Sequence, residues 1–223
     1  GGGIKKTEMV EASSNTYTLV TSASDLKAGS KYIIASNSKS AVAGDIGSNT
    51  YMASISDAKF SSDKTKITDS STAVVLTLGG GKEDGWTFAN SDGKLLGATA
   101  AKKVAWGSGT TTWTITISGS TATIKNTNSN YGTLKYNSGA PRFTTYTSGQ
   151  TAVQLYKLDA AYTVTFNANG GSCSTEKLTA VNGIVTLPGA NRDNYSFGGW
   201  KTADNEFVGN EGKQYTPTGN ITL

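Results

Sequence analysis

Short runs of alternating or continuous apolar residues recur along the chain and predict β-strands. Trp113, Ile115 and Ile117 alternate with threonines, which is the period-2 pattern of a half-buried strand. Residues 31–35 and 73–78 are short apolar runs bounded by turn residues, and these also favour strands. Only residues 24–29 are typical of a capped helical turn, with a serine at its start and a glycine at its end.

Two of these strand patterns meet within residues 154–166. Leu155 and Tyr156 belong to the last strand of one predicted domain, and Val164 and Phe166 belong to the first strand of the next. A connector of about three residues separates them, so we expect it to hold the two modules close, because a chain spans at most roughly 3.3–3.6 Å per residue. The predicted organisation is a flexible leader over residues 1–15, an all-β barrel-like domain over residues 16–159 and a small β module over residues 160–223.

A weak internal repeat in the sequence suggests the architecture of the first domain. Three segments have the order strand, turn, strand, and in each the first strand ends on serine or asparagine: residues 32–43, 86–97 and 122–136. Three such copies predict a closed antiparallel barrel, in a β-trefoil-like form, which would hide its sheet edges. The uneven spacing leaves an open sandwich as the alternative. Residues 79–81 are three glycines, which we interpret as a hairpin turn because the lysine and serine of a phosphate loop do not follow.

The composition agrees with many short strands joined by turns. The 223 residues include 27 glycines, and only 16% are charged while 36% are hydrophobic. Four tryptophans, ten tyrosines and six phenylalanines supply enough large apolar groups for two modest cores, so a disordered chain is disfavoured.

The net charge of +4 does not indicate a nucleic-acid partner. Basic residues are spread along the chain and only two are arginines, Arg142 and Arg192, whereas nucleic-acid binding needs a clustered basic stripe. We interpret Arg142 as the partner of a carboxylate in its own domain. We expect no nucleic-acid binding.

Histidine and cysteine usage disfavours metal sites and most catalytic machinery. The chain has no histidine, which is the commonest general base and metal ligand, and its one cysteine, Cys173, has no thiol partner. Cys173 follows two glycines in a predicted exposed turn, without a basic neighbour that would activate it. We therefore expect no metal, no cofactor and no enzymatic activity. No apolar run is long enough to predict a transmembrane span.

Carboxylates were the remaining candidates for catalysis or calcium binding. Most of them lie in turn-like segments, where aspartate serves turn geometry: Asp45, Asp57, Asp63, Asp69, Glu83 and Asp84. Neither a glycosidase pair nor an EF-hand spacing can be identified among them.

Three aromatic residues are candidates for ligand binding. Trp106 precedes a glycine- and serine-rich loop, and a solvent-facing aromatic ring there could stack on a sugar or anchor a protein partner. Tyr131 and Tyr146 lie beside turn residues and are weaker candidates of the same kind. Burial in the core is the alternative for all three.

Several ordered motifs distinguish the last quarter of the chain: Val164 to Gly171, Leu187-Pro188, Tyr195 to Trp200, Tyr215 to Pro217 and Asn220 to Leu223. This segment resembles the internalin-type B-repeat, also called the Listeria–Bacteroides repeat. The resemblance implies a compact β-grasp-like module of secreted cell-surface proteins, with a role in adhesion, spacing or scaffolding.

The end of the first domain carries a second resemblance, on residues 134–137, Arg142-Phe143, Tyr146 and residues 153–157. These residues are similar to an uncharacterised β module of exported Bacteroidetes-type surface proteins. The resemblance implies a location at the cell surface, with an outer-membrane lipoprotein anchor upstream of this chain as one option. We expect a non-enzymatic binding, adhesion or display protein with an extracellular protein or glycan as partner, and a carbohydrate-binding module of a glycan-uptake system is the alternative.

Overall fold

The computed structural model describes residues 15–68, 72–181 and 183–223. The predicted leader over residues 1–15 lies, except for Asn15, outside the described residues, and so does the candidate Asp69. Within the described part the chain is built from strands, with two single 3₁₀ turns and no α-helix, which confirms the predicted all-β class. It divides into two compact units, residues 15–158 and residues 159–223.

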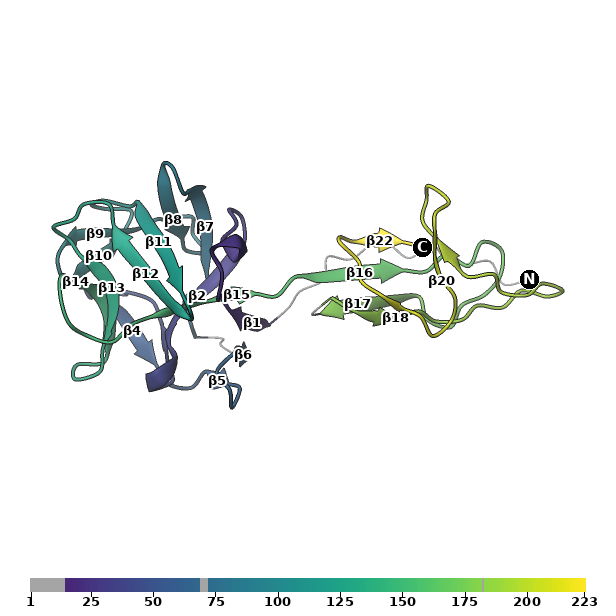
Figure 1. The fold of residues 1–223 in the computed structure, drawn as a ribbon, viewed down its shortest axis with the longest axis horizontal. Coiled ribbons are helices and arrows are strands. Elements are labelled where there is room, and N and C mark those ends of the chain that lie inside the picture. Colours follow the sequence, from purple (N-terminus) through teal and green to yellow (C-terminus); the bar gives the residue numbers. More distant parts are fainter. Residues whose placement is uncertain (1–14, 69–71, 182) are drawn as a thin grey trace. The chain divides into compact units, whose positions relative to one another are not determined.

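Over its described residues, the first unit contains fifteen strands and both 3₁₀ turns. Figure 1 shows how these strands are arranged. In chain order these are β1 (Thr16–Leu19), η1 (Ala23–Asp25), β2 (Lys31–Ser36), η2 (Asn37–Lys39), β3 (Ala41–Ala43), β4 (Met52–Ile55), β5 (Lys59–Phe60), β6 (Lys66–Thr68), β7 (Leu76–Gly81), β8 (Gly85–Ala89), β9 (Leu96–Ala100), β10 (Lys103–Trp106), β11 (Trp113–Ser118), β12 (Thr121–Asn126), β13 (Thr133–Asn137), β14 (Arg142–Tyr146) and β15 (Gln154–Leu158).

Most of these strands belong to one antiparallel sheet. Its order is β3-β4-β14-β13-β12-β11-β8-β7-β2-β15-β1-β6-β5, and β9 pairs with β10 in a separate ladder. The first strand of that order, β3, also pairs with β2, where Ala35 lies opposite Val42. Strand pairing can therefore be followed from β2 to β3, β4 and β14, then through β13, β12, β11, β8 and β7, and from β7 back to β2.

The repeated strand, turn, strand order in the sequence corresponds to three antiparallel strand pairs. They are β2 with β3, β8 with β9 through the bridge Ala89–Leu95, and β12 with β13. Each pair is flanked by one further strand on either side. The flanking strands are β15 and β4 for the first pair, β7 and β10 for the second, and β11 and β14 for the third. Two of the intervening turns also share one chemistry, because Asn90 and Asn126 each accept hydrogen bonds from backbone N–H groups that follow them.

The strand β2 separates two apolar clusters. Tyr32 and Ile34 pack into the larger core, which also contains Trp113 and Phe143, while Ile33 and Ala35 face a smaller cluster on the other side of the sheet. The smaller cluster is completed by residues of β1, β6 and β15: Tyr17, Ile67 and Tyr156. Burial on both faces explains why residues 31–35 show a continuous apolar run instead of alternation.

Two local predictions differ from the structure in their position. The glycines at 79–81 lie inside β7, and the hairpin turn to β8 is formed by residues 82–84. A Cβ on Gly80 would come within 2.2 Å of the Gly85 carbonyl oxygen, so glycine serves the close approach of two strands here. The predicted helical turn is η1, and its N-cap is Ser22, whose side chain accepts from the Ser24 N–H.

Over its described residues, the second unit contains the remaining strands in three small sheets. They are β16 (Ala161–Thr165), β17 (Lys177–Val181), β18 (Val185–Thr186), β19 (Trp200–Lys201), β20 (Phe207–Gly209), β21 (Gln214–Tyr215) and β22 (Ile221–Thr222). The central strand β16 pairs antiparallel with β17 and parallel with β22, while β18 pairs with β21 and β19 with β20.

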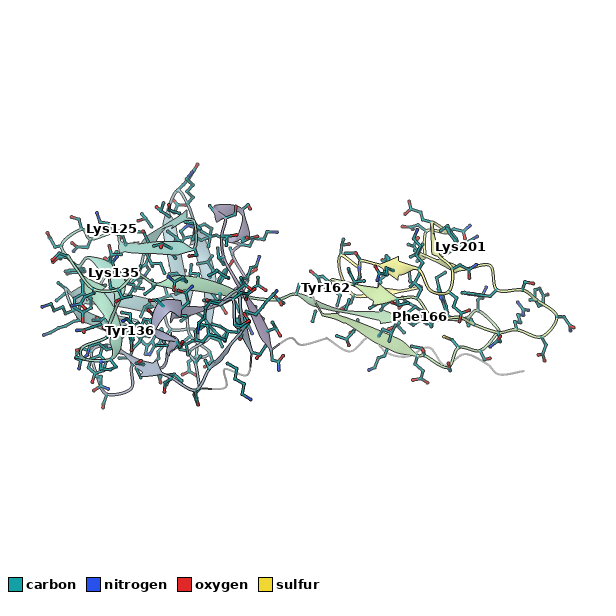
Figure 2. All side chains as sticks on the ribbon, turned by 60° about the horizontal axis from the view of Figure 1, so that its bottom comes forward. Lys125, Lys135, Tyr136, Tyr162, Phe166 and Lys201 are labelled. Carbon is teal, nitrogen blue, oxygen red and sulfur yellow. The ribbon has the colours of Figure 1, made fainter. Side chains whose placement is uncertain are left out.

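One aromatic cluster forms the core of the second unit. Phe166, just after β16, lies inside it (Figure 2), with its ring centroid 4.8 Å from that of Trp200. Phe197 contacts Trp200 edge to face at 5.2 Å, and Val164 and Leu187 complete the packing. Phe197 and Trp200 therefore help to fill this small core.

Within the described residues, no helix is long and apolar enough to cross a membrane.

We predict that Trp113→Ala destabilises the first unit by about 3–5 kcal/mol, because this fully buried ring fills the main core and its Nε1 donates to the Leu96 carbonyl oxygen at 2.9 Å. A urea titration of the full chain, followed by tryptophan fluorescence, measures the change in the free energy of unfolding. The half-buried Trp106→Ala provides the comparison and should cost less. An equal loss for both variants would contradict this assignment of the core.

A pH effect is expected in the turn between β5 and β6. Hydrogen bonds from the Thr65 side chain, the Ser61 side chain and the Thr65 N–H lower the pKa of the Asp63 carboxyl from 3.8 to about 2. Because the folded pKa is lower than the unfolded one, the carboxylate stabilises the turn above about pH 4, and this contribution is lost as the pH falls towards 2.

We therefore expect Thr65→Val to raise the pKa of Asp63 towards 3.8 in a carboxyl ¹³C NMR titration. Ser62→Ala, which removes a hydroxyl of the same turn outside these hydrogen bonds, should leave the titration unchanged. A pKa of about 2 that survives Thr65→Val would show that Thr65 is not its main cause.

Candidate functional site

Trp106 ends β10, and its indole is held in place on both its apolar and its polar side. The ring is partly buried against the main core of the first unit, and Nε1 donates to Asp45 Oδ1 at 2.8 Å. Asp45 is exposed and also accepts from the Ile46 N–H at 2.7 Å. The structure thus combines the two alternatives from the sequence, because Trp106 packs on the core and still keeps part of its ring at the surface.

The two candidate tyrosines differ in their exposure. Tyr131 is partly buried against the main core, in the turn before β13. Tyr146 is only 7% exposed, and its hydroxyl oxygen accepts from Asn137 Nδ2 at 3.1 Å. Tyr146 therefore offers little ring surface to a ligand. No ring contact joins Trp106, Tyr131 and Tyr146 among the residues described.

Three of the candidate carboxylates of the first unit bind groups of their own unit. Asp45 holds Trp106, Asp57 accepts from Thr72 Oγ1 at 3.2 Å, and Asp63 organises its own turn. Glu83 and Asp84 occupy the turn between β7 and β8. Over residues 15–68, 72–181 and 183–223 no group of three or more acidic, cysteine or histidine side chains could hold a metal ion.

The surroundings of Arg142 and Cys173 differ from those expected. Among the carboxylates that the structure describes, none pairs with Arg142: its guanidinium carbon lies 3.9 Å from the ring centroid of Tyr51, and its Nε donates to the Ala140 carbonyl oxygen at 3.0 Å. Cys173 is not fully exposed, because it packs partly against the aromatic core of the second unit. Its Sγ lies 3.1 Å from the Thr175 carbonyl oxygen.

A cavity of about 270 Å³ lies in the second unit. It is formed where the loop after β16 meets the loop before β19, and it is lined by residues 167–169, 190–192 and 195–200. Phe197 and Trp200 connect it to the aromatic core, and an arginine, a tyrosine and three asparagines form its polar wall.

Backbone bridges hold the two loops of this cavity together. The Ser172 N–H donates to the Asn191 carbonyl oxygen at 2.6 Å, and the Asn191 N–H donates back to Ser172 at 2.8 Å. Gly171 permits this approach, because a Cβ there would lie 2.4 Å from the Asn191 carbonyl oxygen. The glycine pair of the sequence therefore serves loop docking as well as the turn.

Arg192 and Tyr195 are exposed residues of the cavity wall. The guanidinium carbon of Arg192 lies 4.2 Å from the ring centroid of Tyr195 and is also close to Gly170, where a Cβ would lie 3.6 Å from that carbon. The guanidinium therefore has a glycine and an aromatic ring as its neighbours. The side chain of Tyr195 is 66% exposed.

This cavity is the functional candidate that sequence reasoning did not identify. Its two loops are separated by about twenty residues, and each by itself has the composition of an ordinary turn. The available signal was the segment 191–195, in which an arginine and a tyrosine stand among polar residues without the alternation that would place them in a core.

Residues 162–223 match the Listeria–Bacteroides repeat domain, which confirms the resemblance inferred from the motifs of this segment. The cavity belongs entirely to the matched segment. No curated protein matches the chain. The repeat is found in surface-exposed bacterial proteins, so the match supports a location at the bacterial cell surface.

We predict that Gly171→Ala destabilises the second unit by about 1–3 kcal/mol, because the new Cβ would force the loops apart against the Asn191 carbonyl oxygen. Amide hydrogen exchange in β16 and β17 measures the effect on the unit. Gly198→Ala is the matched control in the same cavity wall, since a Cβ there would meet nothing within 4 Å. Equal exchange in the two variants would contradict the close docking of the loops.

Proposed function

We propose that this chain acts as a non-enzymatic binding, adhesion or display protein at the bacterial cell surface. The observation that carries the proposal is the match of residues 162–223 to a repeat found in surface-exposed bacterial proteins. The surroundings of the described carboxylates support a non-enzymatic role, because Asp45 and Asp63 each bind neighbouring groups of their own unit.

For the first unit we propose a closed antiparallel barrel of β-trefoil-like form. Two observations support it: the pairings that lead from β2 around to β7 return to β2, and three strand groups repeat one pairing pattern. Closure would protect the sheet edges from unwanted pairing, which is valuable for a protein exposed outside the cell.

For the second unit we propose a β-grasp-like module. The parallel pairing of its first and last strands, β16 and β22, around a single small core supports this interpretation. The proposed domain boundaries are residues 16–159 for the barrel and residues 160–223 for the module, with a lipid anchor to the outer membrane upstream of the chain.

The proposed partner is an extracellular protein or a glycan. We propose no nucleic-acid partner, because the two arginines do not form a cluster: each is stacked on a tyrosine of its own unit. Each stack places a flat guanidinium beside an aromatic ring, an arrangement that is common at protein and glycan interfaces.

A carbohydrate-binding module of a glycan-uptake system is the alternative. The observation that favours it is the position of Trp106, whose ring is fixed by Asp45 and the core while part of it stays at the surface. A ring held in one orientation loses little side-chain entropy when a sugar stacks on it.

The test is an array of glycans and extracellular-matrix proteins probed with the full chain. We expect specific binding, and mass spectrometry of the bound components should show them chemically unchanged. Trp106→Ala, with Trp86→Ala as its control, identifies the carbohydrate alternative if only the former loses a glycan.

One result would contradict the proposal as a whole, and a second would reduce it to one of its roles. Turnover of a glycan or peptide that is lost on neutralising a carboxylate would show an enzyme. If no component of the array is bound, the binding and adhesion roles are contradicted and only the display role remains.

A further inference from the structure

We propose that the cavity between the loops at residues 167–169 and 190–200 binds a sugar ring that carries a carboxylate, as in a uronate- or sialate-type glycan. The inference rests on the proposed role as a surface binding protein and adds to it the site and the class of ligand. It places recognition in the repeat unit, away from the three aromatic candidates of the first unit.

Arg192 supplies the group that would bind the carboxylate. Its guanidinium lies over the Tyr195 ring, with its carbon 4.2 Å from the ring centroid, and close to Gly170, so neighbours on the same loops restrict its position. Within the described residues Arg192 forms no ion pair, although Asp193 follows it directly in the chain. A planar guanidinium with free N–H groups and little remaining rotamer freedom is suited to bidentate binding of a carboxylate.

Tyr195 supplies the stacking surface. Arg192 covers one face of its ring, yet the side chain is still 66% exposed, which leaves the other face open to solvent. A tyrosine ring combines an apolar face with a polar hydroxyl, so it can pack on the C–H face of a sugar and still bind its hydroxyl groups.

Three asparagines supply partners for sugar hydroxyls. Asn167 Oδ1 accepts from the Asn169 N–H at 3.0 Å, which fixes the Asn167 amide and leaves its NH₂ group for a ligand. Asn169 and Asn191 line the same cavity and are both exposed. Each amide offers two donors and an acceptor, which matches the mixed donor and acceptor character of a sugar hydroxyl.

The cavity fits a single sugar ring better than a peptide. Its volume of about 270 Å³ lies just below the roughly 300–1,000 Å³ typical of small-molecule pockets. Peptides are usually bound along a strand edge or by an apolar anchor pocket. Here the lining comes mainly from loops, and the apolar floor is closed because Trp200 is only 2% exposed and its Nε1 is bound to the Pro188 carbonyl oxygen.

The test is a calorimetric titration of the full chain with three acidic glycans: a galacturonate tetramer, a hyaluronan tetrasaccharide and sialyllactose. Each is compared with its carboxyl-reduced counterpart, which keeps the rings and loses the charge. We expect at least one acidic glycan to bind, and its reduced form to bind at least tenfold more weakly.

The variants then assign the site. Arg192→Gln should weaken binding at least tenfold, Arg192→Lys should weaken it less because the charge remains, and Tyr195→Ala should also weaken it. Arg142→Gln is the matched control, since Arg142 forms the other arginine–tyrosine stack, in the first unit. The three side chains changed in these four variants are outside the fully buried cores, so folded protein is expected for each variant.

Four results would overturn the inference. They are binding to none of the three acidic glycans, equal binding of a glycan and its reduced form, unchanged binding by Arg192→Gln, and full competition by polyglutamate, which would indicate an acidic protein partner instead. If the array detects a ligand whose binding is independent of Arg192, the surface-binding function stands and this site alone is rejected.

Discussion

The first unit depends on the placement of β2 between two cores. Its backbone pairs with β15 on one side and with both β7 and β3 on the other, while its side chains alternate between the large and the small apolar cluster. A strand in this position cannot shift by one residue, because a shift would exchange Tyr32 and Ile34 with Ile33 and Ala35 between cores of different size. The register of β2 therefore sets the registers of the strands on both of its sides.

Buried polar groups support this register. Gln154 of β15 accepts from the Asn37 N–H at 2.8 Å, just where β2 ends. The Tyr32 hydroxyl accepts from the Lys27 N–H at 3.0 Å, which ties the 3₁₀ turn before β2 to the core. Each bond would leave a poorly solvated group without a partner if the strand moved, so the polar contacts favour the same register as the apolar packing.

The second unit is stabilised differently, because its strands are short and its core is small. Phe166, Phe197 and Trp200 fill this core, and the loops that bring them together also form the outer cavity. The same loop that buries Trp200 and packs Phe197 against the core leaves Tyr195 at the surface beside Arg192. Stability and the proposed recognition therefore share one segment but use different side chains, so the exposed ones are free to serve a ligand.

Local periodicity and turn chemistry were enough to predict the all-β class and the strands that begin near residues 113 and 162, because these depend on residues close together in the chain. The repeat unit was predicted from the resemblance of its ordered motifs to a known family. The hairpin after the glycines at 79–81 was misplaced by a few residues, since only the neighbouring strand shows where close approach needs glycine. The partner of Arg142 was also wrong, because a nearby ring can replace a carboxylate without any trace in the local pattern. The sequence by itself thus determined the strands, the turns and the family of residues 162–223. Only the tertiary structure decided which strands pair with β2 and which loops meet around Arg192, because these contacts join segments far apart in the chain and depend on the packing between them.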